Sequence, residues 1–102
     1  MRIVILDGRA GIHPDEIRRD KLAGHLNARL AEYAEEGISS FPEGPGAVTA
    51  RFAGVEGHAA VRQLEESGVY ALAEGERVRF LIGPETSFED LDYVQAAAAG
   101  LL

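Results

Sequence analysis

The stretch "RVRFLIGPETSFEDLDY", residues 77–93, decides the fold expected for the whole chain. Its first half alternates strictly between two sides of an extended backbone, with Val78, Phe80 and Ile82 on one side and Arg77, Arg79 and Leu81 on the other. Alternation with a period of two predicts a strand that buries one face and leaves the other open. The arginines therefore belong to the open face.

The second half of the stretch predicts a turn and then a helix. Gly83 and Pro84 interrupt the strand pattern. Thr86 and Glu89 have the spacing of a capping box, which predicts a closing helix over 86–102. Its apolar stripe is expected to consist of Leu91, Val94 and Ala98.

The segment before this stretch contains two further strands and a helix. "EGE" at 74–76 joins residues 69–73 to the strand at 77–82, which predicts a hairpin. Residues 47–53 also alternate, so Arg51 is expected on the same open face as Arg77 and Arg79. Residues 56–68 predict a short helix.

The N-terminal half predicts a strand, a long helix and a loop. Residues 1–7 contain an almost continuous apolar run, typical of a strand at the centre of a sheet. A helix is expected from Pro14, at its first position, to Gly37. Residues 39–46 are expected to form a loop. The apolar stripe of the helix would be Ile17, Leu22, Leu26, Leu30 and Tyr33.

These elements together predict a single domain over residues 1–102. The expected order is β-α-β-α-β-β-α. Since strands and helices are mixed and the last two strands form a hairpin, we expect an α+β, two-layer sandwich. The helices would lie mainly on one face of a mixed or antiparallel sheet.

The composition restricts the classes of function. The chain has 102 residues, a net charge of −7 and no cysteine, which excludes disulfides, thiolate metal sites and a cysteine nucleophile. The acidic balance disfavours nucleic acid as a partner. The sequence contains no signal peptide pattern and no apolar run long enough to span a membrane, so we expect a cytoplasmic protein without a membrane partner.

The candidate binding residues are Arg79, Arg77 and Arg51. A guanidinium is planar and can bind a carboxylate or phosphate through two hydrogen bonds. An acidic or carboxylate small molecule is therefore one interpretation of this face. The other is a solvated surface on which the arginines pair with acids such as Glu43, Glu76 or Glu85.

No catalytic residue and no metal site are predicted. The histidines, His13, His25 and His58, lack the spacing of a metal motif, and each is expected to have a structural or surface role. No serine or threonine has a base at a motif-like spacing. A self-sufficient small enzyme therefore has little support in the sequence.

The chain nevertheless resembles a known family over residues 13–102, most strongly over 48–102. The quoted features are Leu64, Gly68 and Val69, then "VRFLIG" at 78–83, then Thr86 followed by "EDLDY" at 89–93. This pattern is similar to the C-terminal small domain of fold-type I pyridoxal phosphate (PLP) enzymes, in the group of class V aminotransferases and cysteine desulfurases. In that family the arginine of the "VRF" strand commonly binds the substrate carboxylate, which implies this role for Arg79.

The departures from the family limit what the resemblance implies. The family holds PLP on a lysine of its large domain, whereas this chain has no such domain and a single lysine, Lys21, in the middle of the long helix. One hypothesis is a non-catalytic small domain, a split subunit or fragment, whose partner is a PLP-binding large-domain polypeptide. The chain alone would then bind no cofactor. The alternative is a stand-alone binding or interaction module; the sequence also permits a homo-oligomer.

Overall fold

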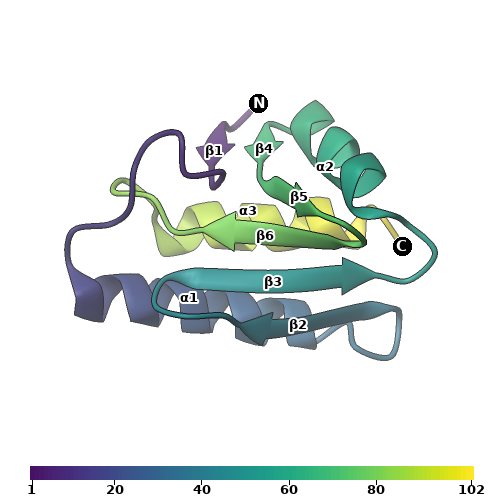
Figure 1. Cartoon of the computed structure of the whole chain (residues 1–102), viewed down its shortest axis with the longest axis horizontal. Coiled ribbons are helices and arrows are strands. Elements are labelled where there is room, and N and C mark those ends of the chain that lie inside the picture. Colours follow the sequence, from purple (N-terminus) through teal and green to yellow (C-terminus); the bar gives the residue numbers. More distant parts are fainter.

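A four-stranded antiparallel sheet forms the centre of the structure, a computed structural model that describes residues 1–102 (Figure 1). Its strands are, in spatial order, β2 (Ile38–Pro42), β3 (Ala47–Phe52), β6 (Arg77–Leu81) and β5 (Leu72–Glu74). A separate parallel pair consists of β1 (Val4–Ile5) and β4 (Val69–Tyr70). The helices are α1 (Glu16–Ala31), α2 (Gly57–Glu66) and α3 (Phe88–Ala99).

The helices cover one side of the sheet. Figure 1 shows α1 and α3 side by side behind β3 and β6, and the two helices contact each other. Helix α2 lies at the end of the molecule beside β4 and β5. The predicted α+β, two-layer arrangement and the order of its elements are confirmed. None of the three helices combines the length and the apolar character needed to cross a membrane.

The core lies between the sheet and the helices, and the predicted alternation decides which side chains enter it. In the β3–β6 pair, Val48 lies opposite Phe80 and Ala50 lies opposite Val78. All four side chains are fully buried and pack with Leu26 and other apolar residues of the helices in a single cluster. The arginine-bearing face is left without a covering helix.

Two strand assignments differ from the prediction. The single strand expected over 69–73 is divided into β4, which pairs with β1, and β5, which pairs with β6. Residues 39–46 were expected to form a loop, but residues 38–42 of this region form β2, which pairs with β3 from Ile38 opposite Phe52 to Pro42 opposite Val48. Because β2 is an edge strand, Pro42 can end it without removing a hydrogen bond from the sheet interior. The two prolines and two glycines of residues 39–46 are typical of a loop, which is why the sequence pattern did not indicate the strand.

The ends of two helices also differ from the prediction. Pro14 was expected at the first position of the long helix, but α1 begins at Glu16. Its N-cap is Asp15, whose side chain accepts a hydrogen bond from the Arg18 N–H. At α3 the predicted pair Thr86 and Glu89 is wrong, because the capping box is formed by Ser87 and Asp90.

The Thr86 hydroxyl is occupied in the preceding turn. Its Oγ1 atom accepts a hydrogen bond from the Gly83 N–H at 2.9 Å. Thr86 therefore closes the turn after β6, and Ser87 caps α3. Because the two hydroxyl residues are adjacent, the sequence pattern does not show which of them is the cap.

The N-terminal strand is shorter and more peripheral than predicted. Instead of a central strand over 1–7, β1 has two residues and pairs only with β4, while Ile3 is 55% exposed. The Leu6 carbonyl accepts a hydrogen bond of 2.8 Å from the Leu81 N–H, so this segment also contacts the end of β6. Similarly, Ile17 of α1 was expected in the core but is 70% exposed.

A glycine at the start of α2 fixes the helix against the β5–β6 hairpin. A Cβ atom on Gly57 would lie 2.4 Å from the Gly75 carbonyl oxygen and 2.6 Å from that of Arg77. Both oxygens belong to the backbone and cannot move independently of the hairpin. Gly75 itself has a φ of +61° and begins the hairpin turn, which has two residues, Gly75 and Glu76, where the three residues 74–76 were expected.

This contact generates a stability prediction. We expect Gly57→Ala to lower the free energy of unfolding by about 1–3 kcal/mol, because the added methyl group overpacks a backbone contact. Gly24→Ala is the matched control: it lies within α1 and its added Cβ would meet nothing within 4 Å. That variant should raise stability by about 0.5–1 kcal/mol. Urea unfolding measures both, and equal effects of the two substitutions would contradict the packing argument.

Candidate functional site

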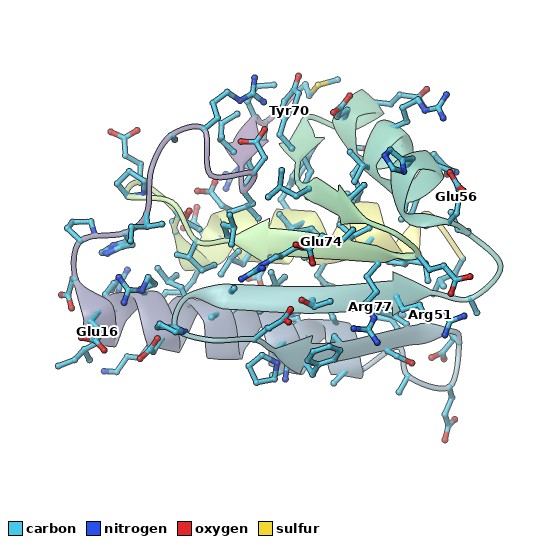
Figure 2. All side chains as sticks on the ribbon, in the orientation of Figure 1. Glu16, Arg51, Glu56, Tyr70, Glu74 and Arg77 are labelled. Carbon is cyan, nitrogen blue, oxygen red and sulfur yellow. The ribbon has the colours of Figure 1, made fainter.

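The open face of the sheet carries the three arginines predicted from the sequence. Two rows of side chains cross the strands here, as the pairing register shows. The row nearer the β5–β6 turn is Ser39, Arg51, Arg77 and Glu74; the next row is Phe41, Thr49, Arg79 and Leu72. Figure 2 shows Arg51, Arg77 and Glu74 on this side of the ribbon. We call Arg51, Arg77 and Arg79 the arginine face.

Arg79 lies in the middle of this face and uses few of its hydrogen-bond donors. Its Nη1 atom is 3.4 Å from the Oε1 atom of Glu74, and its side chain is 33% exposed. The Nε atom is buried and has no partner. The buried Nε atoms of Arg19 and Arg29 also lack a hydrogen-bond partner, but Arg19 donates a 2.9 Å hydrogen bond from Nη1 to the His13 carbonyl, and Arg29 donates from Nη1 and Nη2 to Glu32 and Gln95 at 3.3 and 3.2 Å. Arg79 has no comparably short bond.

The other two arginines have different neighbours. Arg51 forms an ion pair with Glu76 at 2.9 Å, but both side chains are more than half exposed, so the pair contributes little to stability. Arg77 makes no ion pair; its guanidinium carbon lies 5.5 Å from the centre of the Phe41 ring. Two of the three guanidinium groups are thus paired with an acid, and one rests on an aromatic ring.

Three acids, Glu43, Glu76 and Glu85, were predicted as possible partners of the arginines. Of those three, Glu76 pairs with an arginine, whereas Glu43 accepts a hydrogen bond from the buried Thr49 hydroxyl. Glu85 makes no ion pair and lies in the loop before α3. The partner of Arg79, Glu74, was missed, because the hairpin register places Glu74 opposite Arg77 and not opposite Arg79.

The arginine face is not hollowed into a pocket. Four cavities exist in the structure, and neither Arg77 nor Arg79 lines any of them. Arg51 lines two cavities, of about 350 and 300 Å³, near the end of β3. Small-molecule sites normally enclose most of their ligand, so this face by itself can bind a carboxylate on one side only.

The residues that a cofactor or metal would need are not gathered here. PLP requires a lysine for its Schiff base, and the single lysine, Lys21, is exposed on α1 and lines none of the cavities. The residues of this chain therefore do not fit PLP. No group of three or more His, Asp or Glu side chains could hold a metal ion.

The histidines have the separate locations that the sequence analysis expected. His13 Nδ1 accepts a hydrogen bond from the Asp15 N–H at the entry of α1. His25 Nε2 lies 2.8 Å from Asp92 Oδ1, between α1 and α3. His58 is exposed on α2. None of the three histidines belongs to the two rows of the arginine face.

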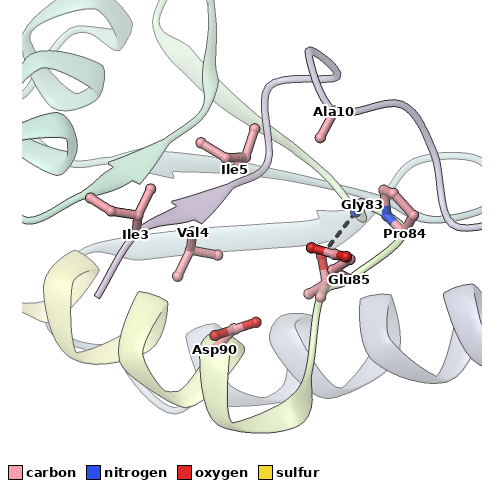
Figure 3. A pocket seen from close by; sticks show the side chains of 9 residues that line it. Ile3, Val4, Ile5, Ala10, Gly83, Pro84, Glu85 and Asp90 are labelled. Carbon is pink, nitrogen blue, oxygen red and sulfur yellow. Dashed lines mark hydrogen bonds between the residues drawn. The ribbon is translucent and has the colours of Figure 1, made fainter. Parts of the chain in front are cut away.

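The largest cavity, of about 510 Å³, lies beside β1 and was not predicted. Figure 3 shows it between β1, the turn after β6 and the first turn of α3. Its lining comes from two ends of the chain, residues 3–10 and 83–90, and no local pattern signals their proximity. The lining residues are Ile3, Val4, Ile5, Ala10, Gly83, Pro84, Glu85, Thr86 and Asp90.

Comparisons with known proteins relate this fold to parts of larger enzymes. No protein-family model matches the chain, and a comparison with curated proteins finds no match. Among solved structures, the chain is similar to the cysteine desulfurase CsdA from Escherichia coli, with a TM-score of 0.71 and 24% identity over 85% of this chain. It is also similar to the lysine aminotransferase from M. tuberculosis, with a TM-score of 0.68 and 27% identity over 83% of this chain.

A thermostable omega transaminase from Pseudomonas jessenii shares the fold as well, with a TM-score of 0.67, 14% identity and 79% of this chain covered. The chain spans only 26% of the desulfurase and 21% of each of the other two enzymes. Aminotransferases and a cysteine desulfurase are the kinds of PLP enzyme that the sequence resembles. The structure is therefore similar to fold-type I PLP enzymes over a fragment of their length.

Proposed function

We propose that this chain is the non-catalytic small domain of a PLP enzyme of the class V aminotransferase group, a split subunit or fragment. Arg79, supported by Arg77 and Arg51, would recognise the carboxylate of a substrate in a site that another polypeptide completes. The chemistry of the reaction would belong to that polypeptide.

The observation that carries this proposal is the state of the Arg79 guanidinium. The buried Nε atom of Arg79 has no partner, so this side chain is poorly explained as a stabilising element. Its single bond to Glu74, at 3.4 Å, is long for a charge-assisted pair. A carboxylate that approached from the open side would supply the short hydrogen bonds that Arg79 lacks.

The flat shape of the arginine face supports a second polypeptide. A small carboxylate held by one wall remains largely in water, where ion pairs are weak. A covering surface would exclude that water and strengthen the pair. Phe41 and Leu72, which flank Arg79 across the sheet, are 40% and 38% exposed, and a protein partner would bury both side chains.

The partner would also supply the cofactor site. Because Lys21 is exposed on α1 and lines no cavity, the Schiff-base lysine has to come from a PLP-binding large-domain polypeptide. The alternative is a stand-alone binding module, whose arginine face would bind an acidic ligand without any catalytic partner. The same exposed Phe41 and Leu72 are compatible with that alternative, in which the acidic ligand would be part of a protein.

Substitution of Arg79 tests whether this residue serves stability. We expect Arg79→Met to change the free energy of unfolding by less than about 1 kcal/mol, because the lost ion pair is long and the buried Nε has no partner. Phe80→Ala, one residue away on the buried face, should cost about 3–5 kcal/mol. Denaturant unfolding of both variants gives the comparison. A loss of several kcal/mol in Arg79→Met would indicate a structural arginine.

Ligand binding tests the role of Arg79 directly. Pyruvate and L-alanine, titrated at constant ionic strength, should bind the isolated chain weakly, with dissociation constants of about 1 mM or above. The NMR signals of Thr49, Arg77 and Arg79 should shift. Arg79→Ala should abolish the shifts, and Arg79→Lys should retain part of them because it keeps the charge but not the paired hydrogen bonds.

Arg62→Ala is the matched control, since Arg62 is exposed on α2 and forms no ion pair. It should leave these shifts unchanged. Binding that is insensitive to Arg79→Ala would refute carboxylate recognition by this residue. Tighter binding of an acidic peptide than of pyruvate would favour the stand-alone module.

Mixing the chain with PLP tests the absence of cofactor chemistry. We expect no stable imine absorption band, because Lys21 is exposed on a helix and lines no cavity that could enclose the cofactor. The measurement is an absorption spectrum after gel filtration. A retained band that disappears in Lys21→Arg would contradict the proposal that the lysine comes from another polypeptide.

A further inference from the structure

Glu43 belongs to the open face of the sheet, although it follows the last residue of β2. Its N–H donates to the Ala47 carbonyl at 3.0 Å, which continues the β2–β3 pairing beyond Pro42. Because side chains alternate along an extended backbone, Glu43 lies on the same side of the sheet as Phe41. Its carboxylate is therefore on the side that carries the arginines.

A buried hydroxyl group holds this carboxylate beside Arg79. Thr49 is only 1% exposed, and its hydroxyl donates a hydrogen bond to the Oε2 atom of Glu43. In the β3–β6 pair Thr49 lies opposite Arg79. The Ile82 N–H donates to the Gly46 carbonyl at 2.9 Å, and the alternation of the ladder then makes Thr49 and Arg79 a pair without mutual hydrogen bonds. Such pairs have Cα atoms only about 4.5 Å apart, which brings their side chains close together.

Glu43 is the acid of this face that no cation matches. Glu76 pairs with Arg51, and Glu74 pairs with Arg79 from the β5 side of the sheet. Glu43 approaches from the β2 side, is half-buried and forms no ion pair. An arginine with few hydrogen bonds and an acid without a cation thus lie near the same threonine. A carboxylate that is partly removed from water is stabilised by a cationic partner.

The charges around Arg79 discriminate between classes of ligand. A simple carboxylate that binds Arg79 is repelled by Glu43 and Glu74, and nothing in the ligand offsets this repulsion. A ligand that also carries an ammonium group has a cation to place against Glu43. Charge complementarity therefore favours a small zwitterion over a carboxylate without an amino group.

We infer that Glu43 is a specificity-determining residue, which binds the ammonium group of the ligand whose carboxylate Arg79 binds. Thr49 is its positioning residue, because the buried hydroxyl fixes the Glu43 carboxylate on the open face. The inference rests on the proposed function, since it requires Arg79 to recognise a carboxylate. It adds a second recognition group, and with it a preference for the amino form of the ligand.

The test compares two ligands that differ only in the ammonium group. L-alanine and propionate are titrated into the full chain at constant ionic strength, and NMR shifts at Thr49 and Arg79 give the dissociation constants. We expect L-alanine to bind about three- to fivefold more tightly than propionate, which is the contribution of a partly exposed ion pair.

Substitution of Glu43 removes the charge and keeps the shape. Glu43→Gln retains an oxygen that can accept the Thr49 hydrogen bond, so the fold should be preserved. It should bring the ratio of the two dissociation constants close to one, because L-alanine loses its partner and propionate loses a repulsion. Glu76→Gln is the matched control, at an acid that pairs with Arg51, and should leave the ratio unchanged.

Substitution of Thr49 tests the positioning role. Thr49→Val removes the hydroxyl and should lose part of the preference for L-alanine, whereas Thr49→Ser should retain it. Denaturant unfolding of both variants measures their stability separately, and a purely structural hydroxyl would change stability without changing the ratio. An unchanged ratio in Thr49→Val would therefore contradict the role of Thr49.

The outcomes separate this inference from the proposed function. Equal binding of L-alanine and propionate, or a preference that persists in Glu43→Gln, would overturn the inference, even if Arg79→Ala abolishes the binding of both ligands and so supports the proposed function. Binding that is insensitive to Arg79→Ala, or no shift with either ligand at tens of millimolar, would refute the proposed function and this inference with it.

Discussion

The register between β3 and β6 is the constraint on which the rest of the structure depends. With Val48 opposite Phe80, the apolar residues of both strands enter the core, and with Thr49 opposite Arg79 the polar residues face outward. A slip of one residue would exchange the two faces of one strand. It would place Arg79 among the helix side chains and expose Phe80, at a cost of roughly several kcal/mol, which is a large part of the stability of a small domain. The core and the arginine face are therefore set by the same pairing.

Patterns of period two and 3.6 predicted the parts of the fold that bury a continuous face. Val78, Phe80 and Ile82 are all buried, as alternation required, and Leu22, Leu26 and Leu30 of α1 are buried as well. Ile17 obeys the same helical spacing but lies in the first turn of α1, beyond the reach of the core. Periodicity indicates which side of an element is apolar, whereas burial also depends on where neighbouring elements end.

The features that sequence reasoning missed depend on single hydrogen bonds or on distant contacts. Thr86 and Ser87 are adjacent hydroxyl residues, and the turn geometry alone assigns the cap of α3 to Ser87. Strand β2 ends in Pro42 and lies at an edge, where strand propensity is weak. The arginines were placed on their face by alternation, but Glu74 as the partner of Arg79 and the cavity beside β1 follow only from tertiary packing.

The parallel pairing of β1 with β4 has a consequence for how the chain folds. Val4 pairs with Val69, so this contact closes a loop that contains α1, β2, β3 and α2. The entropy lost in closing such a long loop is repaid only by a short ladder and by the burial of Val4 and Leu6. The β5–β6 hairpin and the β2–β3 hairpin join residues close in sequence and can form earlier. We therefore expect the N-terminal segment to dock late in folding and to open locally more readily than the two hairpins.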